Sequence, residues 1–234
     1  MRKFAISDIH GCFLSFEALL EKIALTTADE LYFLGDYIDR GPDSKKVIDK
    51  ILELKANGHS AICLAGNHDF ALLDAKTDRR FYSQWYNGWG GKQTLEGFGV
   101  QSINQIEGKY IDFFNSLEMV CEVDDFILVH AGLDFNLNDP LKPDINMLYL
   151  RNWYDQINFD WLGNRKIIHG HTPVKKMRIE FMLERLDQDQ VLDIDGGCFA
   201  KHLTGKGYLC AFEMVNRELF FQKNIDDVSS YWEG

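Results

Sequence analysis

Short apolar runs alternate with stretches of helical periodicity from the first residues of the chain. The runs Phe4–Ile6, Leu31–Leu34 and Ala61–Leu64 predict three strands, each leading into a polar, glycine-rich loop. After the first two loops, apolar residues recur every three or four positions across Phe13–Ile23 and Val47–Leu52, which predicts two helices. The repeated order of strand, loop and helix favours an α/β fold.

The stretch between about residues 70 and 125 differs in composition and is rich in aromatic residues and glycine. Five aromatic residues fall between Phe81 and Trp89. Because no linker composition separates this stretch, we expect a single domain, residues 1–234, with a mainly helical insertion at about 70–125. Packing inside the insertion is the expected role of these aromatic side chains, and lining a substrate groove is the alternative.

Apolar runs resume after the insertion and predict that strands continue into the second half of the chain. Phe126–Val129 and Lys166–Ile168 predict two strands. The later segments Ile179–Leu186, Val191–Ile194 and Tyr208–Phe221 also predict strands, because each is rich in apolar residues.

Histidine and carboxylate side chains gather where the predicted strands end. In an α/β sheet this edge binds ligands, because the loops that leave the strands converge there. Burying so many ionisable groups is costly unless they are paired, and a metal cluster would pair them. The residues at these positions are Asp8, His10, Asp36, Asp39, Arg40, Asn67, His68, Asp69, His130, His169 and His171.

The types of side chain narrow the choice of metal. Carboxylate, imidazole and amide groups without a thiolate suit Mn²⁺, with Fe or Zn²⁺ as alternatives. Asp36 is placed to bridge two ions through its two oxygens. Two ions roughly 3.5–4 Å apart can activate a water molecule and bind a phosphoryl oxygen. Arg40 is the nearest cationic side chain that could neutralise a phosphate.

Charge and composition limit the classes of partner. The chain has 36 Asp and Glu against 25 Lys and Arg, a net charge of −11, which disfavours nucleic-acid binding. Five scattered cysteines without a CxxC pair predict a reduced, cytoplasmic protein. The early charged residues and the lack of an apolar run of about 18 residues predict no signal peptide and no membrane span. Asp226, Asp227 and Glu233 predict a solvated end.

Several short segments resemble the phosphoprotein phosphatase family of calcineurin-like metallophosphoesterases. Its three signature blocks match Asp8–Gly11, Gly35–Gly41 and Gly66–Asp69. The resemblance spans about residues 4 to 200. Further segments match the bacterial and phage serine/threonine phosphatase branch in the same order, at His130–Gly132, Leu150-Arg151, Gly170–Pro173 and Asp193–Gly197.

The resemblance implies a four-layer α/β/β/α sandwich and a site for two divalent ions. A hydroxide bridging the ions would attack the phosphorus directly, without a covalent phosphoenzyme. The implied ligands are Asp8, His10 and Asp36 for one ion and Asp36, Asn67, His130 and His171 for the other.

The resemblance also implies roles in catalysis. His68 would be the general acid, oriented by Asp39. Arg40 and Arg151 would bind the phosphate together with Asn67. The motif does not require the remaining histidines. His169 is expected to be a hydrogen-bonded neighbour of the site, and His59 and His202 are expected to be surface or structural residues.

Three positions depart from the family pattern. Ser7 replaces the usual glycine before Asp8, a change between small residues. Asp69 replaces a glutamate that is one methylene longer, so contacts behind the ligands could differ. Pro173 stands where more distant metallophosphoesterases carry another histidine, which agrees with the phosphatase branch.

Three functions compete on these grounds. The leading prediction is a serine/threonine protein phosphatase that acts on a phosphorylated protein or a small phosphoester. The alternative is a dinucleoside-polyphosphate hydrolase such as a diadenosine tetraphosphatase. Asp39 and Arg40 disfavour only the symmetrical type of that enzyme, which usually alters this block. A non-catalytic metal-binding scaffold is the third, disfavoured because all six ligands and His68 are present.

Overall fold

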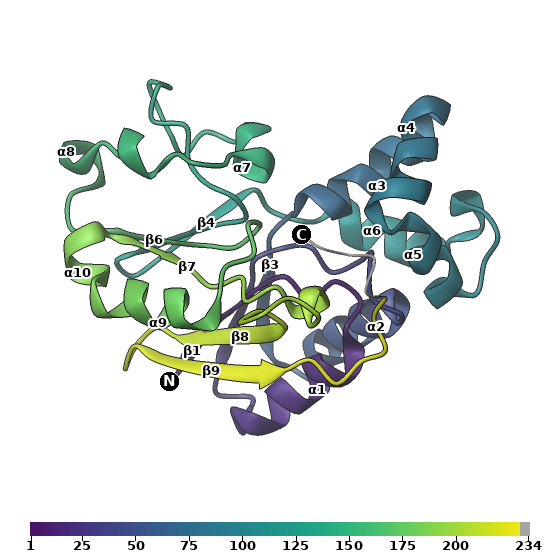
Figure 1. The fold of residues 1–234 in the computed structure, drawn as a ribbon, viewed down its shortest axis with the longest axis horizontal. Coiled ribbons are helices and arrows are strands. Elements are labelled where there is room, and N and C mark those ends of the chain that lie inside the picture. Colours follow the sequence, from purple (N-terminus) through teal and green to yellow (C-terminus); the bar gives the residue numbers. More distant parts are fainter. Residues whose placement is uncertain (230–234) are drawn as a thin grey trace.

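The computed structural model describes residues 1–229 as two β-sheets flanked by helices (Figure 1). One sheet has five strands in the order β3-β2-β1-β8-β9, and the other has four in the order β4-β5-β6-β7. The strands are β1 Lys3–Ile6, β2 Glu30–Phe33, β3 Ser60–Cys63, β4 Val120–Val123, β5 Phe126–Val129, β6 Lys166–His169, β7 Val191–Asp193, β8 Tyr208–Glu213 and β9 Glu218–Lys223.

The helices lie on the outer faces of the sheets and in a separate group between β3 and β4. Figure 1 shows this group, α3 to α6, gathered beside the five-stranded sheet. None of the helices within residues 1–229 is long and apolar enough to cross a membrane. The α-helices are α1 Phe13–Lys22, α2 Ser44–Ala56, α3 Asn67–Thr77, α4 Arg79–Gln84, α5 Gly91–Phe98, α6 Gly108–Asn115, α7 Asn146–Tyr149, α8 Phe159–Leu162, α9 Lys176–Glu184 and α10 Leu186–Asp189.

Short segments of other helical geometry join these elements. A π-helix, η1, follows α4 directly and supplies residues near the site. The 3₁₀ segments are η2 to η4 in chain order. Their bounds are η1 Trp85–Trp89, η2 Ile103–Gln105, η3 Tyr154–Gln156 and η4 Cys198–Ala200.

Side-chain alternation along β1 explains the layers. Successive strand residues point to opposite faces, so Phe4 and Ile6 join the core beneath α1 and α2, whereas Ala5 joins the core between the sheets. Phe212 of β8 and Phe126 of β5 meet in this second core, with ring centroids 5.9 Å apart. The expected four-layer α/β/β/α arrangement is confirmed.

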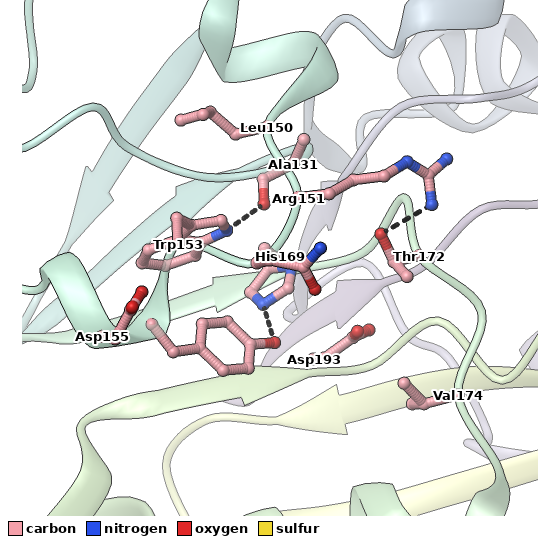
Figure 2. Close-up of a pocket in the computed structure, with 11 residues that line it drawn as sticks. Ala131, Leu150, Arg151, Trp153, Asp155, His169, Thr172, Val174 and Asp193 are labelled. Carbon is pink, nitrogen blue, oxygen red and sulfur yellow. Dashed lines mark hydrogen bonds between the residues drawn. The ribbon is translucent and has the colours of Figure 1, made fainter.

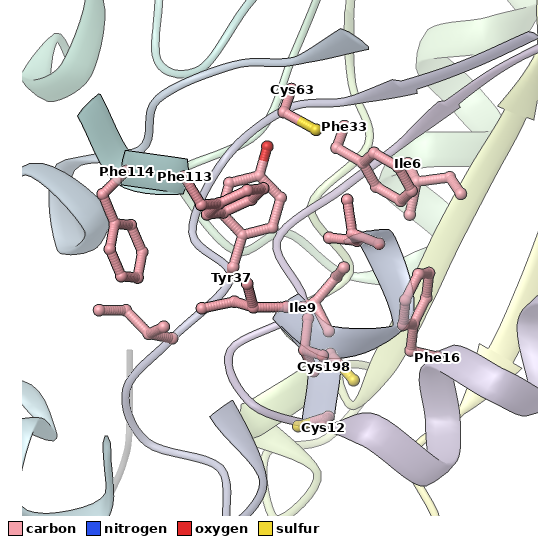
Figure 3. Packing of buried hydrophobic residues seen from close by; sticks show 14 of the residues in the cluster. Ile6, Ile9, Cys12, Phe16, Phe33, Tyr37, Cys63, Phe113, Phe114 and Cys198 are labelled. Atoms are coloured by element: carbon pink, nitrogen blue, oxygen red, sulfur yellow. The ribbon is translucent and has the colours of Figure 1, made fainter. Parts of the chain in front are cut away.

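The helical group is fixed to the first core through aromatic contacts. Phe113 of α6 packs edge-on against Tyr37, 5.3 Å between ring centroids, and Tyr37 donates a hydrogen bond to the Leu64 carbonyl. Figure 3 shows Phe113 and Phe114 beside Tyr37, with Phe16 and Phe33 packed nearby. The loop that carries Tyr37 is therefore held between a sheet and the helical group.

Parallel pairing brings the loops after several strands to one edge. β1 pairs in parallel with β2 and β2 with β3, while β5, β6 and β7 are also mutually parallel. The carboxyl ends of these strands therefore lie together, as the sequence predicted, and carry the polar loops described below.

One strand expected from the apolar pattern is wrong, and the strand prediction at Tyr208–Phe221 is confirmed. The strand predicted at Ile179–Leu186 is wrong, because this segment forms α9 and α10 with Ile179, Met182 and Leu186 buried at helical spacing. The segment Tyr208–Phe221 forms an antiparallel hairpin of β8 and β9.

The prediction of a solvated acidic end is also wrong for Asp226. Its buried carboxylate accepts hydrogen bonds from the backbone N–H groups of Leu14 and Ser15 and from the Ser15 hydroxyl, so it caps the first turn of α1. Asp227 is exposed as expected, and Glu233 lies outside the described residues.

Candidate active site

Strained backbone marks the loops that carry the polar cluster. Among residues 1–229, ten non-glycine residues have positive φ, and half of them belong to the predicted site. Such conformations cost about 1–3 kcal/mol each and persist where the surrounding contacts impose them. These five residues are His10, Asp36, Asp39, Arg40 and His171.

Asp36 lies at the centre of the cluster, between two histidines. Its Oδ2 is 3.3 Å from His10 Nε2, and its Oδ1 is 3.6 Å from His130 Nε2. Possible ligand atoms form two trios within 4.8 Å, His10–Asp36–His68 and Asp8–Asp36–His130. Asp36 is common to both trios, which is the geometry that a bridging carboxylate requires.

Near His130 the cluster places two histidine ring nitrogens close to the side-chain oxygen of Asn67. The carbonyl oxygen of Leu34 accepts from His130 Nδ1, and burial lowers the pKa of this neutral ring, so its Nε2 carries a lone pair. That nitrogen lies 3.0 Å from Asn67 Oδ1, and His171 Nδ1 lies 2.9 Å from the same oxygen. A cation between these atoms would turn an acceptor–acceptor contact into ligation.

Buried side-chain atoms without hydrogen-bond partners also indicate a cation site. Four buried side-chain atoms of residues 1–229 have no hydrogen-bond partner, and three of them belong to this cluster, namely Asp8 Oδ2, His171 Nε2 and Asp195 Oδ2. Burial, with the charges of Asp195 and Asp36, raises the pKa of Asp8 well above its usual value. The carboxyl of Asp195 has its pKa raised to about 6, chiefly by burial. Divalent ions would remove this electrostatic cost, and the donor set fits them.

His68 and Asp39 form a hydrogen-bonded pair on the other side of Asp36. His68 Nδ1 lies 2.8 Å from Asp39 Oδ2, and both side chains are buried. Asp39 Oδ2 also accepts from Trp85 Nε1 at 3.0 Å, while its Oδ1 accepts from the Thr94 hydroxyl at 2.6 Å. Burial raises the pKa of Asp39 well above its usual value, and the donors Thr94 and Trp85 act against this increase.

Arg40 reaches both histidines of this side. Its guanidinium donates to His10 Nε2 at 3.1 Å and to His68 Nε2 at 2.9 Å. It also lies over the ring of Phe199, 4.0 Å from the ring centroid. Burial and the Arg40 charge together lower the pKa of His68 well below its usual value. A phosphate bound to Arg40 would therefore favour the protonated form of His68.

Asp69 fixes the loop that carries Asp36. Its Oδ2 accepts from the backbone N–H groups of Asp36 and Gly66, at 2.7 and 2.9 Å, and its Oδ1 accepts from Tyr37 N–H at 3.1 Å. The backbone of Gly66 lies so close to the Asp36 carboxylate that a Cβ at this position would be 2.1 Å from Asp36 Oδ1, which excludes any larger residue. The aspartate that replaces the usual glutamate therefore supports the ligand loop through its backbone.

The cluster opens into a cleft of about 280 Å³. Arg40, Asn67, His68 and His171 line its floor side, and the exposed Arg151 lies at its rim. Gly88, Trp89 and Tyr149 complete the wall. The structure thus brings together every residue that the sequence predicted for metal and phosphate, with Asp8, His10, Asp36 and His130 buried beneath the cleft.

The other histidines lie apart from this cleft. The Tyr154 hydroxyl donates to His169 Nε2 at 2.7 Å, and His169 Nδ1 donates to the Gly170 carbonyl, so this ring is a hydrogen-bonded neighbour of the site. Strand β6 ends at His169, so His171 lies in the loop that follows it. His59 lies in a surface depression beside α1, and His202 is exposed near Val228.

Sequence reasoning missed several residues that contact the site. Trp89 packs on His68, with 5.4 Å between the ring centroids. The aromatic segment therefore contributes both to packing, through the buried Trp85, and to the wall of the cleft, through Trp89. Phe199 of η4 packs against His10 and Arg40. The aromatic crowding was the available signal for the tryptophans, whereas Phe199 follows the Asp193–Gly197 match without a motif of its own.

Replacing Trp85 with phenylalanine is expected to lower kcat by about tenfold, the equivalent of about 1.4 kcal/mol, because Asp39 loses a donor and orients His68 less tightly. Steady-state kinetics should show a change in kcat with KM nearly unchanged. Tyr110→Phe is the matched control, because it removes a buried ring's hydrogen bond to Asp49 away from the cluster. Equal loss of kcat in both variants would contradict the positioning role of Trp85.

Comparisons with known proteins identify a family for this chain. A model of the calcineurin-like phosphoesterase family matches residues 1–212. The chain is 28% identical over 240 residues to the bis(5'-nucleosyl)-tetraphosphatase PrpE [asymmetrical] of Bacillus cereus, covering 89% of this chain and 91% of that one. It is 29% identical to a symmetrical bis(5'-nucleosyl)-tetraphosphatase of Nitrosomonas europaea, covering 57% of this chain and 45% of the relative.

Solved structures share the fold. A putative diadenosine tetraphosphatase superposes with a TM-score of 0.66 at 19% identity, covering 94% of this chain and 92% of that one. A protein serine/threonine phosphatase from Saccharomyces cerevisiae, similar to human PP5, gives the same TM-score at 14% identity, covering 97% and 81%. The family match over residues 1–212, together with this shared fold, shows that the chain belongs to the calcineurin-like phosphoesterase family.

Proposed function

We propose that this phosphoesterase hydrolyses dinucleoside polyphosphates and cleaves diadenosine tetraphosphate asymmetrically. The observation that carries the proposal is the likeness to the asymmetrical bis(5'-nucleosyl)-tetraphosphatase of Bacillus cereus, which extends over about nine-tenths of both chains. This proposal replaces the leading expectation of a serine/threonine protein phosphatase, since the relatives support the alternative better.

The family implies two divalent metal ions, and the cluster offers a donor set that fits them. When bound, the ions would activate water and neutralise charge on the phosphate. In our proposal Asp36 contributes an oxygen to each ion. Asp8 and His10 complete one set, and Asn67, His130 and His171 complete the other. Mn²⁺ is the ion that we propose, with Fe or Zn²⁺ as alternatives for the same ligand types.

The remaining residues bind the phosphate and move a proton. Arg40 and Arg151 both line the cleft and bind phosphoryl oxygens, assisted by the Asn67 amide. His68 keeps one proton on Nδ1, directed at Asp39, and delivers another from Nε2 to the leaving oxygen. In the structure the Arg40 guanidinium contacts the same Nε2 atom. Phosphate binding must therefore move the guanidinium away from Nε2 before His68 can donate its proton to the leaving oxygen.

A protein phosphatase remains the second candidate. The Asp39–Arg40 block is intact, and the wall of the cleft presents Trp89 and Tyr149, which could pack against a peptide. The fold of a yeast protein serine/threonine phosphatase also covers 97% of this chain. Phosphorylated proteins and small phosphoesters are therefore the competing substrates.

Products distinguish these activities. Purified protein loaded with Mn²⁺ is incubated in parallel with diadenosine tetraphosphate and a phosphoserine peptide, and nucleotides and inorganic phosphate are quantified by chromatography. We expect preferred hydrolysis of the dinucleotide into AMP and ATP. Formation of two ADP molecules would indicate symmetrical cleavage. A higher kcat/KM for the peptide would overturn the proposal in favour of the protein phosphatase.

A further inference from the structure

A second cavity, of about 410 Å³, lies beside the cleft, and the proposed function leaves it without a role. It lies between the segment 150–155 and strands β6 and β7, and Figure 2 shows Trp153, His169 and Asp193 around it. Its volume falls within the range of about 300–1,000 Å³ that is typical of small-molecule sites.

The cavity and the phosphate site share one side chain in their walls. Arg151 lines both the cleft and the cavity. Its Nη1 donates to the Thr172 hydroxyl at 3.1 Å, and Thr172 lines the cavity while the preceding residue, His171, lines the cleft. A ligand with a phosphate held at Arg151 can therefore extend from the cleft into the cavity. A simple phosphomonoester such as p-nitrophenyl phosphate brings no nucleoside to the cavity.

The walls of the cavity combine aromatic surface with hydrogen-bond acceptors. Tyr154 contributes a partly exposed ring, which is fixed by its hydrogen bond to His169. The buried Trp153 packs behind Tyr154, 5.0 Å between ring centroids, and its indole N–H donates to the Ala131 carbonyl. A preordered ring such as that of Tyr154 can pack against a planar base at little entropic cost.

The carboxyl groups of the cavity differ in how accessible they are to a ligand. Asp155 is exposed, and its oxygens can accept from an exocyclic amine or from ribose hydroxyls. Asp193 is buried, and its Oδ1 already accepts from the Asp195 N–H. Arg151, which lines both the cavity and the cleft, attracts phosphate, whereas the acidic side chain of Asp155 does not. The electrostatics therefore place phosphate at Arg151 and an uncharged, donor-rich group inside.

We propose that this cavity is a nucleoside subsite, which binds one nucleoside of a dinucleoside polyphosphate while the scissile phosphate lies in the cleft. The inference rests on the proposed function, because a phosphoprotein would bring no nucleoside. It assigns substrate selection to the segment 152–155 and to Val174, residues with no part in the chemistry of the metal cluster.

The test fills the cavity and compares two substrates. Val174 lines the cavity, and Val174→Phe adds a ring there. We expect the ratio of kcat/KM for diadenosine tetraphosphate to that for p-nitrophenyl phosphate to fall by about tenfold or more, the equivalent of at least about 1.4 kcal/mol. Val215→Phe is the matched control, since it makes the same change at a side chain that is 57% exposed, and it should leave the ratio unchanged. An unchanged ratio in Val174→Phe would overturn the subsite.

A second variant and a direct measurement keep the subsite testable by other routes. Asp155→Ala removes both acceptor oxygens at an exposed position and should lower the same ratio, which protects the test if Val174→Phe does not fold. Calorimetry with adenosine alone should show binding to the wild type that Val174→Phe abolishes. If the wild type does not hydrolyse the dinucleotide, the proposed function is wrong. The calorimetric binding of adenosine then tests the nucleoside subsite independently of that function. Adenosine binding that Val174→Phe leaves unaffected would overturn the subsite.

Discussion

Replacing His68 with asparagine is expected to lower kcat by about 10²–10⁴-fold, the usual contribution of a general acid or base. Asparagine cannot deliver a proton to the leaving oxygen, although it can keep a hydrogen bond to Asp39. The loss should be larger for an alkyl phosphate than for p-nitrophenyl phosphate, because an alkoxide needs protonation and p-nitrophenolate does not. Steady-state kinetics with both substrates would measure this difference.

Two controls separate proton transfer from damage to the site. Metal content, measured by mass spectrometry of the loaded protein, should stay at the wild-type level in His68→Asn. His59→Asn makes the same change in a surface depression between α1 and α2 and should leave kcat unchanged. Equal, measurable turnover by His68→Asn and the wild type would remove His68 from the mechanism. Absence of turnover in both proteins would favour the non-catalytic scaffold.

Replacing Asp36 with asparagine is expected to weaken both metal sites at once. Asp36 faces His10 with one oxygen and His130 with the other, so a single substitution removes charge from each set. Wild-type protein should gain about 2.7 kcal/mol of unfolding free energy for each ion bound when the metal is present at a hundred times the Kd of that site. Most of this gain should vanish in Asp36→Asn, together with hydrolysis of every substrate. Thermal unfolding with and without Mn²⁺ measures the gain.

The matched control for this variant is Asp43→Asn. Asp43 precedes α2 and forms a partly exposed ion pair with Lys46, 2.9 Å apart, where a surface interaction contributes little. This control should bind two ions and keep the full stabilisation by metal. A wild-type metal content in Asp36→Asn would contradict the bridging role that we propose.

The ligand cluster could be predicted from the sequence because its geometry is local. Each short block lies where a parallel strand ends, and the register of β1, β2 and β3 brings Asp8, Asp36 and Asn67 to one edge. The fold class follows from the same alternation of strands and helices. The blocks also carry a family resemblance, which supplied the roles of His68 and Arg151.

The residues that pack around the predicted site residues could not be predicted from the sequence, and the reason is physical. Trp85 lies in a π-helix and Phe199 in a 3₁₀ turn, two conformations without a hydrophobic period that a sequence pattern could reveal. Asp226 is similar, since an acidic residue near the chain end gives no sign that it caps α1. At Ile179–Leu186, apolar content alone did not separate a strand from a helix, and burial at helical spacing decides it.

The pairing of β1 with β8 has a consequence for the protein while it is being synthesised. Phe4 pairs with Glu213, so one edge of β1 waits for a partner that is made about 200 positions later. At translation rates of about 5–20 residues per second, that edge stays open for roughly 10–40 s. An unpaired strand edge is a template for association with other chains. The nascent protein is therefore most exposed to aggregation after its ligand loops exist and before β8 has left the ribosome.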